Sequence, residues 1–141
     1  MPVEAGVMDI GYEPRAVVKA ITTEKMYAFS ARHGGLLENS VHTNRQVAKV
    51  LGFPNVICQG NMMLNYISEM LFKVYREHWI QHSKASVAYV KSVFPGDTLS
   101  AKGVVKEKEV ANSATRLKLD VWVENKEGEK VVIGNAEVTI S

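Results

Sequence analysis

The chain has 141 residues, of which 46% are hydrophobic; that is enough for one domain with a buried core and too few for two domains of ordinary size. Charged residues make up 23% of the chain and the formal net charge is only +2, which argues against partners such as nucleic acid or an anionic membrane. The first residues lack the pattern of a secretion signal, and no apolar run approaches the roughly 20 residues of a membrane-spanning helix, so we expect a cytoplasmic protein.

The chain starts without a clear periodic pattern. Residues 1–15 are interpreted as an irregular lead-in, and residues 16–21, "AVVKAI", are rich in β-branched residues. That composition favours a strand. We therefore expect the first regular element to be a short strand.

A short helix is predicted over residues 44–51. Thr43 and Gln46 have the spacing of a capping box at its start. Gly52 and Pro54 follow its last turn, where glycine and proline commonly end helices.

A second helix is predicted over about residues 60–79, and it is the longest predicted element. Apolar residues recur there at intervals of three and four, which places them on one side of a helix, and charged residues occupy other positions around the axis. The apolar positions are Met63, Ile67, Met70, Leu71 and Val74.

After this helix the hydrophobic period changes to two. Residues 117–123, "LKLDVWV", alternate aliphatic side chains with polar or aromatic ones, as a strand with one buried face does. Residues 86–94, 98–110 and 130–140 are rich in β-branched residues, and "FPGDT" and "NKEGE" supply turns. An antiparallel sheet covered by one long helix makes an α+β layered domain.

The stretch "YAFSARHGGLLENSVHTNRQVAKVLGFPNVICQGNMM" and the later "VFPGDTL" resemble the MaoC-like (R)-specific enoyl-CoA hydratase and dehydratase family. The resemblance covers the chain from about residue 21. It implies the hot-dog fold, an antiparallel sheet wrapped around a long central helix, as a single domain over residues 1–141. The positions that match the family's pattern are Asn39, His42, Ala48, Gly52, Phe53, Gly60, Pro95, Gly96 and Asp97.

The resemblance also implies an activity, namely adding water to an enoyl thioester of CoA or acyl-carrier protein, or removing it from a 3-hydroxyacyl thioester. His42 would be the general acid/base residue, because an imidazole takes up and releases protons near neutral pH. Gly60 would donate its backbone N–H to the thioester oxygen, because the N-terminus of a helix carries a partial positive charge.

The carboxylate that the family pairs with this histidine is missing. Leu37 stands five residues before His42, and an alignment with a two-residue insertion puts Gly35 at the carboxylate position instead. Glu38, four residues before His42, is the one nearby carboxylate that would replace it, and we keep it as a candidate catalytic residue.

Three further residues are candidates for substrate binding. Asn39 and Asn44 flank His42 and can orient a water molecule or the imidazole ring, although an amide carries no proton at neutral pH. Ser68 stands eight residues after Gly60, where the family has a serine on its central helix.

We expect neither a metal nor a cofactor. Cys58 is the only cysteine, so it forms no internal disulfide and no thiolate metal site, and we interpret it as a small buried residue. His78 and His82 have the spacing of two ligands on one helix face, but no third ligand is evident.

Three functions remain open from the sequence. The first is the thioester hydratase or dehydratase, the second is a non-catalytic hot-dog subunit that supports an active partner chain, and the third is a single-base isomerase or dehydratase of a polyketide-type thioester. The family resemblance implies a homodimer or higher oligomer, and a heteromeric complex is an alternative.

Overall fold

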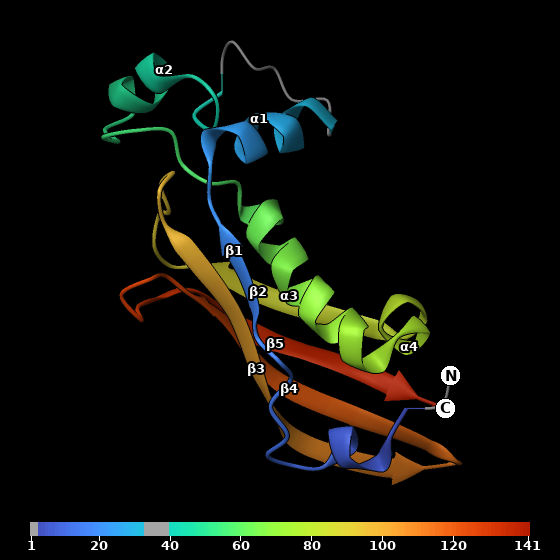
Figure 1. The fold of residues 1–141 in the computed structure, drawn as a ribbon. Helices are drawn as coiled ribbons and strands as arrows, with labels where there is room; N and C mark the ends of the chain where they lie inside the picture. The colour runs from blue at the N-terminus through green and yellow to red at the C-terminus, as the bar shows by residue number, and fades with distance from the viewer. Residues whose placement is uncertain (1–2, 33–39) are drawn as a thin grey trace.

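The computed structural model describes residues 3–32 and 40–141. Figure 1 shows one sheet with a long helix lying across it, and two short helices gathered where that long helix begins. The elements in chain order are η1 (Ala5–Met8), β1 (Val17–Ala20), α1 (Thr23–Arg32), α2 (Arg45–Val50), α3 (Gly60–Tyr75), α4 (Glu77–Gln81), β2 (Ser83–Tyr89), β3 (Thr98–Ala111), β4 (Ala114–Glu124) and β5 (Lys130–Ile140).

The five strands form one antiparallel sheet in the order β1-β3-β4-β5-β2. This confirms the predicted α+β class and the hot-dog arrangement, with α3 as the central helix (Figure 1). Predicted strand bounds agree within a few residues except for 86–94, whose strand runs from Ser83 to Tyr89. The β2–β5 ladder ends there because the N–H groups of Val90 and Lys91 both donate to the carbonyl of Val131.

The core lies between α3 and the sheet. On β4 the residues of one face, from Leu117 to Val123, are at most 1% exposed, as the period-two pattern predicts. On α3, Ile67 and Leu71 are fully buried in the same cluster. Burial of these apolar side chains supplies most of the free energy that holds helix and sheet together.

The long helix is shorter than predicted. It ends at Tyr75, because Arg76 has a positive φ of 54° and breaks the run before α4 starts at Glu77. The indole N–H of Trp79 donates to Ser68 Oγ at 2.7 Å. Buried Trp79 thus packs α4 against α3, and the predicted single helix over residues 60–79 is wrong in its last turn.

Helix α1 was not predicted. Its start is fixed by Thr22, whose hydroxyl accepts the N–H of Lys25 at 3.1 Å. Met26 and Ser30, four residues apart, form its buried side. The apolar stripe is short and partly polar, which explains why hydrophobic periodicity alone does not reveal it.

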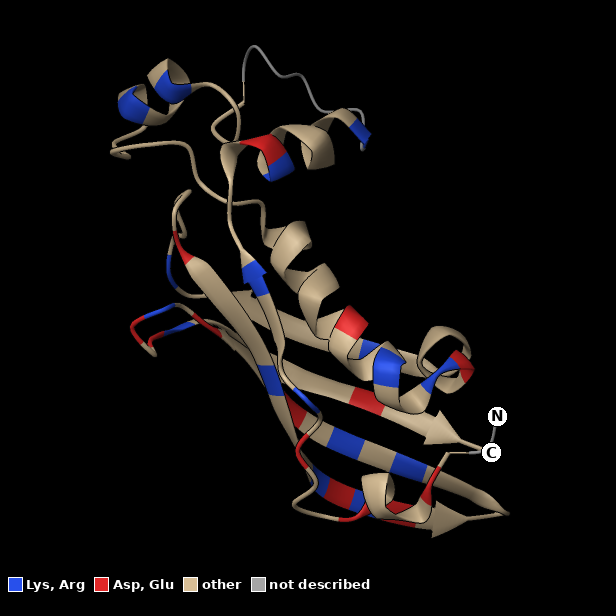
Figure 2. Cartoon of the chain, in the orientation of Figure 1, with Lys and Arg blue, Asp and Glu red and all other residues tan. Residues whose placement is uncertain are grey.

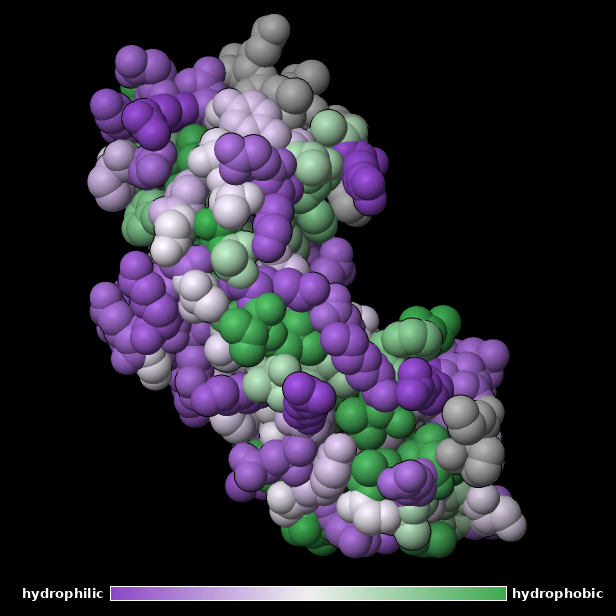
Figure 3. Space-filling view, viewed as in Figure 1, coloured by the Kyte–Doolittle hydropathy of each residue, from purple (hydrophilic) through white to green (hydrophobic). Residues whose placement is uncertain are grey.

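The exposed surface is mixed. On the face in Figure 3, hydrophilic and hydrophobic residues are intermixed, and hydrophobic ones show over the middle of the molecule, where β1 and α3 lie, and again toward the lower right. No helix in the described part of the chain is long and apolar enough to cross a bilayer.

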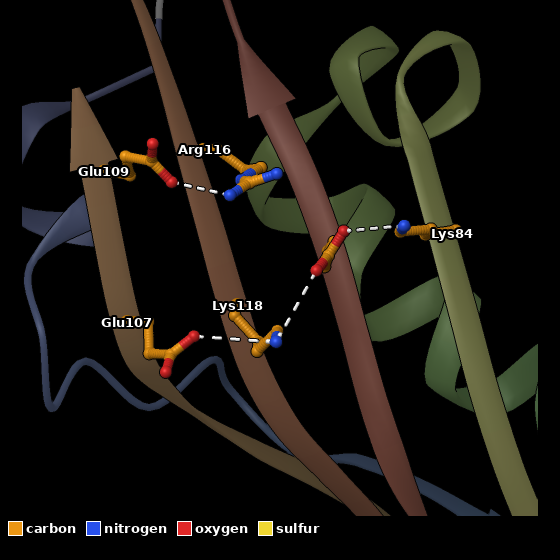
Figure 4. A network of polar contacts seen from close by, with 6 residues as sticks. Lys84, Glu107, Glu109, Arg116 and Lys118 are labelled. Carbon is orange, nitrogen blue, oxygen red and sulfur yellow. Dashed lines mark hydrogen bonds and ion pairs between the residues drawn. The ribbon is translucent and has the colours of Figure 1, made fainter. Parts of the chain in front are cut away.

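Charged side chains on the outer face of the sheet pair directly across the strands (Figure 4). Glu137 of β5 lies 3.2 Å from Lys84 Nζ of β2 and 3.7 Å from Lys118 Nζ of β4. Lys118 in turn lies 3.6 Å from Glu107 of β3. Because all three contacts join residues that are partners in the strand register, the chain of charges favours this register over a shifted one.

Glu137→Gln tests this network. Its hydrogen bond to Lys84 lowers the pKa of Glu137 below its usual value, so its stabilising effect is present at neutral pH and is lost as the pH falls through the lowered folded-state pKa. We expect a lower thermal midpoint than the native protein at pH 7 and a difference that shrinks toward pH 3. Glu13→Gln, an exposed residue outside the sheet, is the control, and a difference that stays constant with pH would contradict the network's role.

Candidate functional site

His42 is held in a tight turn. The N–H of Asn44 donates to the carbonyl of Ser40 at 2.8 Å, and the N–H of His42 donates to Ser40 Oγ at 3.1 Å. The ring nitrogen Nδ1 lies 2.7 Å from the carbonyl oxygen of Ile57. Because a carbonyl only accepts, Nδ1 carries the proton of the neutral ring and Nε2 is left as the basic nitrogen.

Backbone contacts connect this turn to the rest of the fold. The N–H of Ile57 donates to the carbonyl of Val41 at 3.2 Å, and the N–H of Cys58 donates to the carbonyl of Val93 at 2.7 Å. From α1, the Tyr27 hydroxyl donates to the carbonyl of Thr43 at 2.5 Å. The histidine therefore sits on a turn supported from two sides rather than on a free loop.

Asn44 caps α2. Its Oδ1 accepts the N–H groups of Gln46 and Val47 at 3.0 and 3.3 Å. The predicted capping box is wrong, because Thr43 is buried and the cap is one residue later. These two hydrogen bonds are those of an N-cap, and substrate binding by Asn44 stays a prediction.

The start of α3 is fixed against α1. Gln59, the residue before Gly60, donates from Nε2 to the carbonyl of Met26 and to Ser30 Oγ, both at 2.8 Å. Among the described residues it does not cap the helix with its side chain. The first N–H groups of a helix have no partner within it, so those of α3 are suited to a ligand. Figure 2 shows that the first half of this helix carries no charged side chain.

One pocket is lined by both His42 and Gly60, two of the predicted catalytic residues. It has a volume of about 310 Å³, and we call it the His42 pocket. Larger hollows, of about 540 and 550 Å³, lie against the sheet and beside β1, and neither is lined by His42. The walls of the His42 pocket include His42, Ile57, Gly60, Met63, Tyr89 and Lys91.

Cys58 and Lys91 also line the His42 pocket. Burial raises the pKa of the Cys58 thiol to about 12, so this cysteine stays protonated and is a poor nucleophile, in keeping with its interpretation as a buried residue. Lys91, at the wall, forms an ion pair with Glu129 at 2.5 Å. Lys91 is a pocket residue that the sequence interpretation missed.

The predicted substrate-binding residue Ser68 lies outside this pocket. Ser68 is two turns along α3 from Gly60, its Oγ accepts from Trp79, and it is not among the residues that line the His42 pocket. Glu38 and Asn39 lie outside the described residues. Their predicted roles are therefore not tested by the geometry.

The sequence matches a family model, and the fold is similar to solved structures. A family model described as "MaoC like domain" matches residues 7–127. The structure is similar to the (R)-hydratase PhaJ1 of Pseudomonas aeruginosa, with a TM-score of 0.80 at 22% identity, covering 99% of this chain and 86% of that one. It is also similar to an (R)-hydratase from A. caviae involved in PHA biosynthesis, with a TM-score of 0.77 at 20% identity, covering 97% and 100%.

A third similar structure is a complex. It is HadBC of Mycobacterium tuberculosis, described as a 3R-hydroxyacyl-ACP dehydratase, with a TM-score of 0.68 at 13% identity and a cover of 89% of this chain and 96% of that one. At these identities the three structures establish the fold alone. No curated protein matches the sequence.

Two variants test the helix cap that Asn44 provides. We expect Asn44→Ala to lower the free energy of unfolding by about 1 kcal/mol, the typical cost of losing an N-cap, and Asn44→Ser, which can also cap, to restore most of it. Denaturant unfolding measures both. Equal stability of the alanine variant and the native protein would rule out the cap as a stabilising contact.

Proposed function

The chain belongs to the MaoC-like family, and we propose that it is a hydratase or dehydratase of enoyl or 3-hydroxyacyl thioesters with His42 as its general acid/base residue. One observation carries the proposal. His42, with Nδ1 bonded to Ile57, lines the same pocket as Gly60, the first residue of the central helix.

The chemistry follows from those two groups. In hydration, Nε2 of His42 takes a proton from water while the water oxygen bonds to the β-carbon of the thioester. The electrons move toward the thioester oxygen, which accepts the N–H of Gly60 at the positive end of α3. The imidazolium then returns its proton to the α-carbon, which completes the addition of water.

This mechanism still needs a carboxylate that assists His42. Among the described residues that line the His42 pocket, none is Asp or Glu. We propose that Glu38 supplies the missing carboxylate, by holding the water or the imidazole. Support for this rests on its position four residues before His42 in the sequence.

We further propose that the protein is a homodimer joined through β2. Within the described residues, β2 pairs with β5 on one side and is the edge of the sheet on the other, and its seven residues are exposed or half-exposed. Such an edge is a template for pairing with another strand. Tyr89 ends β2 and lines the His42 pocket, so this interface would adjoin the site.

A second candidate is a non-catalytic subunit of a heteromeric complex. The absence of a carboxylate among the described pocket residues favours it. It predicts no turnover by the isolated chain and turnover once an active partner chain is added.

The hydration of crotonyl-CoA by the purified protein tests the first candidate. We expect His42→Ala to lower kcat/KM by roughly 10²- to 10⁴-fold, the usual contribution of a general acid/base residue. The loss of absorbance of the conjugated thioester gives the rate.

His82→Ala is the matched control, because His82 is exposed and lies outside the His42 pocket. Glu38→Gln tests the proposed role of the Glu38 carboxylate. If this carboxylate assists His42, we expect kcat to fall at least 10-fold. Activity that survives His42→Ala would remove this residue from the mechanism.

The oligomeric state tests the role of β2. Light scattering coupled to size exclusion is expected to give twice the mass of one chain, and Ala85→Pro, which places a residue without an N–H in the edge strand, is expected to weaken the dimer. A native protein that elutes as a monomer at micromolar concentration would contradict this arrangement.

A further inference from the structure

Tyr89, the last residue of β2, reaches across to the start of α3. A Cβ atom built on Gly60 would lie 2.8 Å from Tyr89 Cζ and 3.0 Å from both Cε atoms. These are the three nearest atoms, and the two Cε distances are equal. The face of the ring, near its hydroxyl end, therefore packs on the backbone of Gly60.

This contact disfavours a side chain at residue 60. A separation of 2.8 Å is shorter than carbon atoms tolerate, so any side chain at residue 60 would displace the ring. The ring of Tyr89 occupies the space beside the amide that is proposed to bind the thioester oxygen.

The fold determines where the ring lies. Val87 and Tyr89 point to the same face of β2, because side chains alternate along a strand, and half-buried Val87 packs against the hydrophobic core. Gly134 of β5 lets β2 lie close, since a Cβ there would be 2.1 Å from the carbonyl oxygen of Ser86. Tyr89 is 47% exposed, and its side chain both contacts Gly60 and lines the His42 pocket.

We propose that Tyr89 is the specificity-determining residue of the His42 pocket, and that its ring restricts substrates to thioesters whose α-carbon carries no branch. This rests on the proposed function, because it assumes that the thioester oxygen accepts the N–H of Gly60. A thioester bound in that way places its α-carbon next to the space over Gly60. An α-methyl group is about the size of the Cβ that this space does not admit.

The flat form of the favoured substrate fits the same geometry. A conjugated enoyl thioester without an α-substituent is planar and can lie along the face of an aromatic ring. Aromatic faces supply a rigid wall with few rotatable bonds, which holds a flat ligand at a low entropy cost.

Two thioesters that differ by one methyl group test the proposal. Crotonyl-CoA has no α-branch, and 2-methylcrotonyl-CoA has one. We expect the native protein to prefer crotonyl-CoA in initial hydration rates, and Tyr89→Ala to raise the kcat/KM ratio of 2-methylcrotonyl-CoA to crotonyl-CoA at least 10-fold, in the range that one methyl group produces in a close-fitting pocket. Tyr89→Phe, which keeps the ring, is expected to restore a ratio close to the native one.

Val110→Ala is the control, since Val110 is 68% exposed on β3 and lies outside the pocket. A ratio that Tyr89→Ala does not change would overturn the specificity role and leave the proposed function standing. A native protein that hydrates neither thioester would overturn both.

The ring contact itself is tested without activity. Thermal unfolding of Gly60→Ala, Tyr89→Ala and the double variant forms a double-mutant cycle. We expect Gly60→Ala to lower the midpoint when Tyr89 is present, because its ring has to move, and to lower it by less in the Tyr89→Ala background. Equal effects in the two backgrounds would show that the ring does not pack on Gly60, and would overturn the inference.

Discussion

The hydrogen bond between His42 Nδ1 and the carbonyl oxygen of Ile57, at 2.7 Å, is the contact on which the proposed chemistry depends. It selects the tautomer in which Nε2 is basic, and it joins the His42 turn to the segment that leads into α3. The segment reaches Gly60 three residues later. A single contact thus sets which ring nitrogen of His42 is basic and ties the ring to the segment that leads into α3.

The surrounding structure keeps this geometry rigid at the start of α3. Gln59 ties the helix to α1, Tyr27 ties α1 to the His42 turn, and Tyr89 brings the edge strand β2 onto Gly60. Each of these side chains comes from a different element. The pocket is therefore a product of the whole fold, with a loop on one side, a helix end on another and a strand end on a third.

Prediction from the sequence was most accurate where one periodic pattern controls the structure. The alternation over residues 117–123 predicts the buried face of β4, because every second side chain meets the core. The break at Arg76 was not predicted, since a non-glycine residue with a positive φ has no sequence pattern of its own. Helix α1 was also missed, because its buried side is short and partly polar. The N-cap of α2 was assigned to Thr43, whereas the structure has Asn44 in that position.

At the candidate site, individual residues were predicted but the contacts between them were not. His42 and Gly60 were predicted from a family resemblance, and the structure places both in one pocket. The bond from His42 to Ile57 joins residues 15 apart, and the contact from Tyr89 to Gly60 joins residues 29 apart. Contacts of that kind depend on the packing of several elements, so no local pattern predicts them.

The most direct test of the central claim is an NMR titration with butyryl-CoA, a saturated thioester that cannot be hydrated. We predict that free His42 has its proton on Nδ1, and that binding shifts both the Nε2 resonance of His42 and the amide resonance of Gly60 in one saturable step. A proton on Nε2 in the free protein, or a Gly60 amide that does not respond to saturating thioester, would contradict the proposed site.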